Sequence, residues 1–93
     1  MSRYFVDIKE KAQLDLAKLK KDEPKFYAKA LKLIGELYEH PRTGTGKPKQ
    51  LSADRAGQWR RKISDKHRLV YEIHDTEVVV LVISAYGHYG DKS

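Results

Sequence analysis

The sequence predicts an α+β fold in which two helices pack on one face of a twisted, mainly antiparallel sheet. Two observations support this prediction. Apolar residues recur at helical spacing in the first 40 residues, and from Gly57 onward they lie in short runs separated by turn residues. Because 93 residues suit one core of modest size, we expect a single domain over residues 1–93.

The N-terminal half predicts one short strand and two helices. Residues 4–8 alternate as a strand does, and Asp7 and Glu10 are placed as a capping pair for the helix that follows. Pro24 is suited to the first turn of a second helix. The predicted apolar stripes are Ile8, Ala12, Leu16 and Leu19 on the first helix, and Tyr27, Leu31, Ile34 and Tyr38 beside Phe26, Ala30, Leu33 and Leu37 on the second.

The second half predicts a basic loop and a meander of at least three strands. The segment PRTGTGKPKQ cannot continue a helix and is expected to reach a short edge strand at residues 50–52. The strands are GQWRRKIS, HRLVYEIH and EVVVLVIS, with turns at residues 65–66 and 75–76. Since the last run is apolar on both faces, we expect both to be covered and this strand to lie inside the sheet, beside the first strand.

The positive charge is concentrated in one segment. The chain has a net charge of +6, and between Arg42 and Arg68 nine Lys or Arg residues face two Asp residues, which leaves +7 there and −1 elsewhere. Such segregation favours a surface that binds a polyanion. The alternative is a solvated basic face without a ligand.

Several classes of protein are disfavoured. The chain has no cysteine, and its longest apolar run is too short to cross a bilayer. The N-terminus lacks the apolar region of a signal peptide, so we expect a cytoplasmic protein without membrane contact. Pro48 follows Lys47 in the GTGK stretch where a phosphate-binding loop needs Ser or Thr, and the histidines form no metal-ligand cluster, so no cofactor or metal is expected.

Strand alternation sorts the basic residues of the meander by face. Trp59 and Arg61 should point to one face, and Arg60 and Lys62 to the other. We expect Arg61 to lie at an edge or to reach out of the layer. Leu69, Tyr71 and Ile73 read as core residues of the next strand, which sends Arg68 to the open face beside Lys62.

Arginine, histidine and tyrosine together suit RNA cleavage, because the substrate carries its own nucleophile, the 2′-hydroxyl. Arg68 can bind the phosphate and neutralise charge on the phosphorane. His88 can remove or donate a proton, and Tyr86 or Tyr89 can stack on a base or orient the phosphate. The alternative interpretation is that the tyrosines close the core, His88 is a surface turn residue and Arg68 is an edge charge.

These residues resemble the Txe/YoeB family of the RelE superfamily of bacterial toxin–antitoxin systems. The likeness covers nearly the whole chain, and its specific part is GTGKPKQL followed by WRRKISDKHRLVYEI and the terminal SAYGHY. The resemblance implies a RelE-like β-α-α-β fold with the first strand beside the last. It also implies a ribosome-dependent endoribonuclease that cuts messenger RNA in the ribosomal A site and is held inactive by a cognate antitoxin in a hetero-oligomer.

Carried over by position, Arg68, His88 and Tyr89 match the family's catalytic residues. Two positions depart from the family pattern: Lys49 replaces a glutamate regarded as the general base, and Lys62 replaces a second arginine. A lysine crowded by cations has a lowered pKa, so Lys49 or Lys62 is a candidate base. Alternatively, Lys49 only stabilises charge and His88 is the base, or this chain cleaves poorly. The residues expected to bind RNA are Lys47, Arg60, Arg61, His67 and Tyr86.

One alternative function uses the same scaffold. A RelE-like or ParE-like protein can inhibit gyrase or bind nucleic acid without cutting RNA. The terminal His88-Tyr89 pair favours the nuclease, because a binding protein needs no titratable group beside Arg68.

Overall fold

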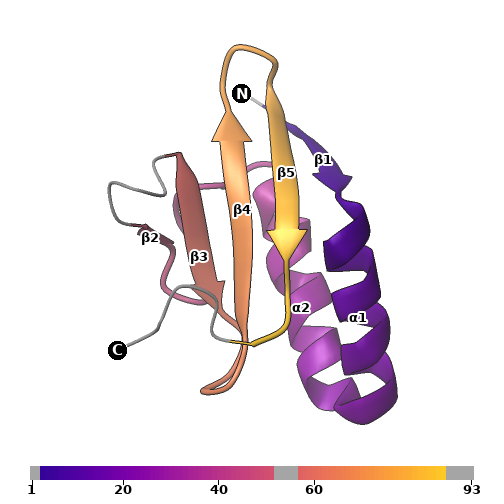
Figure 1. The fold of residues 1–93 in the computed structure, drawn as a ribbon. Helices are drawn as coiled ribbons and strands as arrows, with labels where there is room; N and C mark the ends of the chain where they lie inside the picture. Colours follow the sequence, from indigo (N-terminus) through magenta and orange to yellow (C-terminus); the bar gives the residue numbers. More distant parts are fainter. Residues whose placement is uncertain (1–2, 52–56, 88–93) are drawn as a thin grey trace.

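The computed structural model describes residues 3–51 and 57–87. The N-terminal half forms β1 (Phe5–Ile8), α1 (Glu10–Asp22) and α2 (Pro24–Leu37). A loop leads to the short strand β2 (Lys49–Gln50), and the meander follows as β3 (Gln58–Lys62), β4 (Arg68–His74) and β5 (Val79–Ser84) (Figure 1). The predicted order of elements is confirmed.

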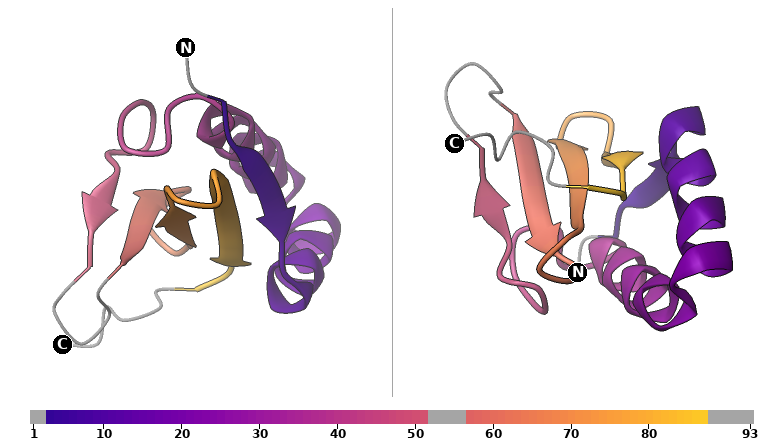
Figure 2. Two further views of the ribbon diagram at one scale, coloured as in Figure 1. Left: turned by 90° about the horizontal axis from the view of Figure 1, so that it is seen from above. Right: turned by 60° about the horizontal axis from the view of Figure 1, so that its bottom comes forward.

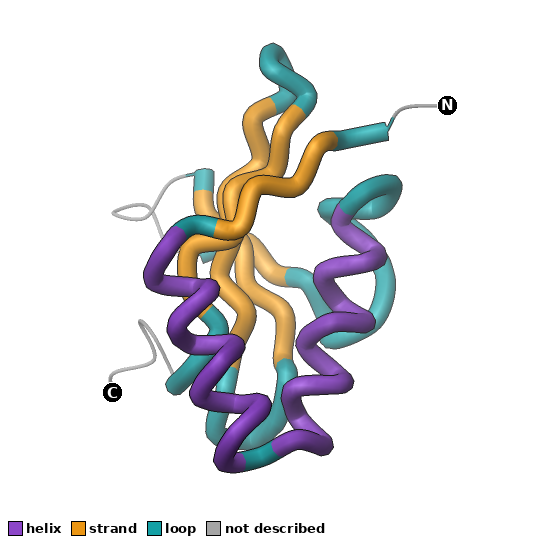
Figure 3. The backbone as a smooth tube through the Cα atoms, turned by 90° about the vertical axis from the view of Figure 1, so that its right-hand side faces the viewer, coloured by secondary structure: helices purple, strands orange, loops and turns teal. Residues whose placement is uncertain are grey.

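The five strands form one sheet in the order β1-β5-β4-β3-β2. The strand β1 pairs in parallel with β5, while the other neighbours are antiparallel. Both helices lie on the same face of this twisted sheet, as the turned views show (Figures 2 and 3). The predicted α+β architecture, with the first strand beside the last, is therefore confirmed. The face without helices is called the open face below.

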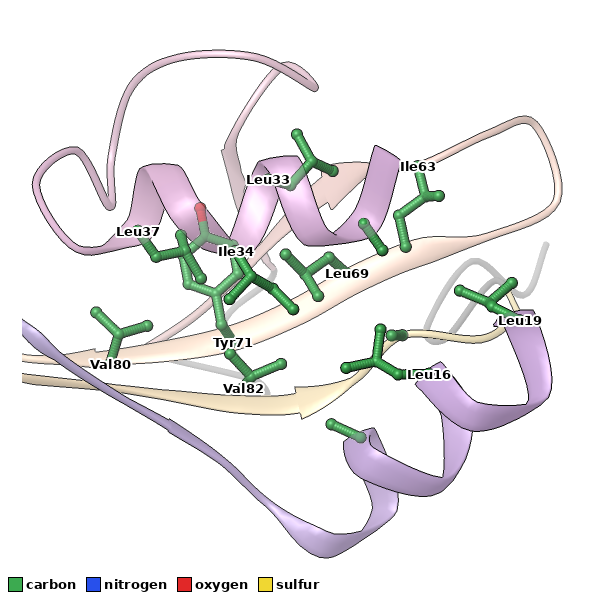
Figure 4. Close-up of a cluster of buried hydrophobic side chains, with 13 residues drawn as sticks. Leu16, Leu19, Leu33, Ile34, Leu37, Ile63, Leu69, Tyr71, Val80 and Val82 are labelled. Carbon is green, nitrogen blue, oxygen red and sulfur yellow. The ribbon is translucent and has the colours of Figure 1, made fainter. Parts of the chain in front are cut away.

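The core lies between the two helices and the sheet (Figure 4). The apolar stripes of α1 and α2 meet the inward side chains of β4 and β5, which is the packing that their spacing predicts. Burial removes this apolar surface from water and stabilises the fold. The buried cluster includes Leu16 and Leu19 from α1, Leu33, Ile34 and Leu37 from α2, and Leu69, Tyr71, Val80 and Val82 from the sheet.

Three local expectations are wrong. The N-cap of α1 is Lys9 with no side-chain cap, because Asp7 belongs to β1 and pairs with Leu81. The strand β5 begins at Val79, since the preceding residues turn and Val78 has a φ of 57°. The helices cover only one face of β5, so Val79 and Leu81 on the open face stay half-buried.

No helix in the described ranges is long and apolar enough to span a membrane.

Candidate functional site

Four cationic residues share the open face, on neighbouring strands. Lys62 of β3 lies directly opposite Arg68 of β4. Lys49 of β2 lies opposite Arg60 of β3, two residues before Lys62 on the same strand. Alternation along β3 places Arg60 and Lys62 on the face away from Arg61 and the helices. The prediction that Arg68 and Lys62 share a surface is confirmed. We call Lys49, Arg60, Lys62 and Arg68 the open-face cation cluster.

The backbone at Arg68 lies beside the C-terminal end of the described chain. The Arg68 N–H donates to the carbonyl of Gly87 at 3.0 Å. The Arg68 guanidinium donates through Nη1 to the carbonyls of Ser64, at 2.5 Å, and His67, at 3.2 Å, in the turn before β4. His88 and Tyr89 lie outside the described residues, so their roles stay predictions. The residue before them is nevertheless bonded to the Arg68 backbone.

The three lysines predicted for the site differ in their surroundings. Lys62 Nζ is 2.8 Å from Asp65 Oδ1, so its ammonium has a carboxylate partner. Lys49 is exposed on β2, and Lys47 is exposed in the loop, with a φ of 53°. The roles of Lys49 and Lys62 as a base stay predictions.

Arg61 is a structural residue in this fold. Its side chain is 0% exposed, on the core face of β3, which contradicts the expected position at an edge. The guanidinium donates to Glu36 Oε1 at 2.7 Å, to the Tyr71 hydroxyl at 3.1 Å, and to loop carbonyls. These carbonyls belong to Thr45 at 3.2 Å, Thr43 at 2.7 Å, and His40. Because a side chain must reach the surface to contact RNA, the prediction that Arg61 binds RNA is wrong.

The basic loop wraps around this buried guanidinium. A Cβ at Gly44 would lie 2.4 Å from Glu36 Oε1, and one at Gly46 would lie 3.1 Å from both Arg61 Cβ and the Lys62 carbonyl. The two glycines of GTGK therefore allow close packing of the loop, with the Lys62 N–H donating to the Gly46 carbonyl at 2.7 Å. The loop delivers Lys47 and Lys49 to the edge of the open face.

The electrostatics of the Arg61 site favour an ionised Glu36. Burial raises the pKa of Glu36, but hydrogen bonds from Thr45 and Arg61 outweigh it and hold the pKa below its usual value. The neighbouring Tyr71 has a raised pKa because its phenol is buried. Its hydroxyl donates to the Pro41 carbonyl at 2.8 Å and stays protonated. The network therefore holds the loop through an ionised Glu36 and a neutral Tyr71.

His67 and Tyr86 are also engaged inside the molecule. The imidazole of His67 is 2% exposed, so it offers no surface to RNA and its prediction as an RNA-binding residue is wrong. Its centroid lies 4.3 Å from that of the half-buried Tyr86 ring, and Lys18 Nζ lies 4.4 Å from the Tyr86 centroid. The packing supports the alternative interpretation that Tyr86 closes the end of the core.

Sequence reasoning missed Glu36, Glu23 and Gly87. Glu36 lies in α2 between two buried leucines, Leu33 and Leu37. A carboxylate at such a position, together with an arginine among the core-facing residues of β3, is a signal for a buried ion pair. Glu23 lies between the helices and accepts a hydrogen bond from His67, 44 residues away. No local pattern signals a contact at that separation.

The arrangement suits binding of an RNA backbone. Lysine and arginine side chains on one face attract phosphates, and arginine can bind one through two donors. Among the described residues, no group of three or more His, Asp or Glu side chains is placed to hold a metal ion. A reaction at this face would use the side chains of the cluster and whatever the segment after Gly87 contributes.

Comparison with known proteins points to one family. A sequence model described as a YoeB-like toxin of bacterial type II toxin–antitoxin systems matches residues 8–89. The toxin YoeB of Mycobacterium bovis and the toxin RelK of Mycobacterium tuberculosis are each 47% identical to this chain over 58 residues. Those matches cover 62% of this chain and 66%, just under two thirds, of each relative.

Solved structures are similar over more of the chain. A YoeB/ParE toxin from Agrobacterium tumefaciens is 28% identical with a TM-score of 0.84, covering 91% of this chain and 99% of that one. The YoeB-YefM complex from Staphylococcus aureus contains a chain that is 26% identical with a TM-score of 0.77, covering 95% of this chain and 100% of that one. A mutant of the Escherichia coli toxin RelE is 30% identical with a TM-score of 0.69, covering 91% and 83%.

Proposed function

The chain belongs to the family of YoeB-like toxins of bacterial type II toxin–antitoxin systems, and on that premise we propose that it is a ribosome-dependent endoribonuclease that cuts messenger RNA in the A site. The open-face cation cluster is the observation that carries the proposal. Four cations on adjacent strands offer a binding surface for the RNA backbone, and Arg68 lies beside Gly87, which precedes His88 and Tyr89.

The proposed reaction is attack of the 2′-hydroxyl on the adjacent phosphate. The oxygen–phosphorus bond to the 5′-oxygen breaks, and the products are a 2′,3′-cyclic phosphate and a 5′-hydroxyl. Arg68 stabilises the charge on the phosphorane, with Lys62 and Arg60 binding the flanking backbone. His88 gives a proton to the leaving oxygen, and Tyr89 orients the phosphate. A water-excluding ribosomal site would strengthen each of these interactions.

The substituted position, Lys49, supplies one candidate for the base. Lys49 is exposed beside Arg60, across the β2–β3 pair. We propose that it acts either as the base that removes the 2′-hydroxyl proton or as a fixed charge, in which case His88 removes that proton and then gives it to the leaving 5′-oxygen. The substitution Lys49→Glu tests whether this lysine takes part in the reaction. Activity should fall if Lys49 acts as a base or as a fixed charge, and it should rise if the position has only lost the family carboxylate.

A cognate antitoxin is the proposed partner. The similar YoeB-YefM complex from Staphylococcus aureus supports this, since its YoeB chain shares the fold of this one. An antitoxin that covers the open-face cation cluster would block the messenger from reaching Arg68. Acidic residues are the expected complement to that surface.

The proposal is tested by adding the purified chain to translating ribosomes and mapping the new 5′ ends on the message. We expect cuts within A-site codons, and loss of these cuts with His88→Ala. A message with a 2′-deoxy nucleotide at the cut position should resist cleavage, because the nucleophile is missing. Intact messages with failing DNA supercoiling would instead support the gyrase-inhibitor alternative.

A further inference from the structure

We propose that His67 is a positioning residue that holds Gly87, the residue before His88, against Arg68. This inference rests on the proposed nuclease function and concerns the geometry of its site. The imidazole is buried beneath the site, and its two ring nitrogens bond to different parts of the chain. Nδ1 accepts the Gly87 N–H at 2.9 Å, and Nε2 lies 2.9 Å from Glu23 Oε2.

The two partners determine the tautomer of the ring. A backbone N–H can only donate, so Nδ1 must carry a lone pair and no proton. The remaining ring proton is then on Nε2, which donates it to the Glu23 carboxylate. Glu23 is a suitable acceptor because the hydrogen bond from His67 lowers its pKa and keeps it ionised. The carboxylate therefore orients the ring so that Nδ1 faces Gly87.

Aromatic packing fixes the plane of the same ring. The Phe26 ring meets it edge-on, with the ring centroids 6.2 Å apart. The Tyr86 ring, from the segment after β5, has its centroid 4.3 Å from that of His67. With 2% exposure and these neighbours, the imidazole has one accessible orientation. Its contacts join the α1–α2 junction, the start of β4 and the segment that follows β5.

Gly87 is bonded on both sides of its Cα atom. Its N–H donates to the Nδ1 atom of His67. Its carbonyl accepts the N–H of Arg68, which follows His67 in the chain. We call these two bonds the Gly87 clamp. Gly87 has a φ of 85°, a conformation that glycine adopts without strain. The clamp sets where the chain leaves Gly87, immediately before His88 and next to the catalytic arginine.

The Gly87 clamp would affect the cleavage rate through the position of the reacting groups. A displacement of about 1 Å at reacting groups lowers a rate by about a hundredfold. Because His67 is buried and touches no RNA, it acts only through the Gly87 clamp. Losing the Nδ1 acceptor should therefore lower kcat and leave KM for the ribosome-bound message nearly unchanged.

Two amide variants separate the two ring nitrogens. In His67→Asn, the side-chain oxygen is attached where Nδ1 is attached in histidine and can accept the Gly87 N–H. In His67→Gln, the amide nitrogen can reach Glu23, but no acceptor faces Gly87. Packing volume alone predicts the opposite order, since glutamine fills the histidine cavity better. Glu23→Gln is the matched control, because it keeps an acceptor for Nε2.

The test combines cleavage kinetics on ribosomes with amide hydrogen exchange at Gly87. We expect His67→Gln to lose about a hundredfold in kcat and His67→Asn to stay within about tenfold of the wild type. The Gly87 amide should exchange at least about tenfold faster in His67→Gln only, while core amides such as Val82 keep their protection. Equal kcat losses in both variants, or unchanged Gly87 exchange in His67→Gln, would overturn the clamp.

The two readouts keep the clamp separate from the proposed function. If the wild-type chain does not cut messages on ribosomes, the nuclease proposal fails. The exchange of the Gly87 amide then decides the clamp alone, since it needs no substrate. If the wild type cuts and both variants show wild-type exchange at Gly87, the clamp fails and the nuclease stands.

Discussion

Replacing Arg61 by methionine should destabilise the protein severely, although the sequence suggests a surface cation. Methionine keeps an apolar chain of similar length and removes only the guanidinium. The change leaves Glu36 without its 2.7 Å partner, and deprives the carbonyls of His40, Thr43 and Thr45 of a donor. Glu36 keeps the Thr45 N–H, at 2.9 Å.

The magnitude follows from the desolvation of these groups. Breaking a buried ion pair by removing one partner costs about 3–5 kcal/mol. Three unsatisfied carbonyls would add about 1–3 kcal/mol each if they stayed dry. The 23% exposure of Glu36 lets water reach this end of the network, so we take about 4 kcal/mol for the whole change. In a domain of this size that corresponds to a Tm lower by about 15–30 °C.

The assay is thermal and urea unfolding of both Arg61→Met and Arg60→Met. Arg60 is the control, because it is the adjacent arginine on the opposite face of β3 and is half-buried there. Its substitution should change stability by about 0.5 kcal/mol or less. A loss below about 1 kcal/mol in Arg61→Met would refute the structural role argued for the network.

Two further results are expected. In urea unfolding, Gly46→Ala should lower the free energy of unfolding by about 1–3 kcal/mol more than Gly57→Ala does. The two glycines have nearly equal φ values, 86° and 87°, but only a Cβ at Gly46 would meet neighbours within 4 Å. Equal losses would contradict the close packing of the loop. The lowered pKa of Glu36 stabilises the folded state above the unfolded carboxyl pKa of about 4.3, and this contribution is lost as the pH falls through the folded pKa. The Tm difference between the wild type and Glu36→Gln should therefore shrink from pH 6 to about pH 3; a constant difference would exclude a charge effect.

The fold was predictable because each element carries its own pattern. The apolar stripes of α1 and α2 and the alternation in β3 and β4 are local signals. The position of β1 beside β5 followed from the apolar final strand, whose remaining edge needed a partner. The start of β5 was not predictable, since Val78 favours strands by composition yet adopts a left-handed turn.

The candidate site was predictable only in part. Alternation placed Lys62 and Arg68 on one face, and the sheet register bears this out. It could not show that the loop carbonyls and Glu36 would enclose Arg61, because those groups lie 16–25 residues away in the chain. The burial of His67 likewise depends on Glu23 and Gly87, which are distant in sequence. Long-range polar partners leave no periodic signal.

The most direct test of the account is the single-turnover cleavage rate of Arg68→Gln on ribosomes stalled with a codon in the A site. Glutamine removes the charge and the phosphate donors and leaves a shorter, neutral amide side chain. The account predicts a rate lower by about a hundredfold or more in a protein that thermal unfolding shows to be folded. Cleavage within about threefold of the wild-type rate would contradict the claim that this arginine stabilises the phosphorane.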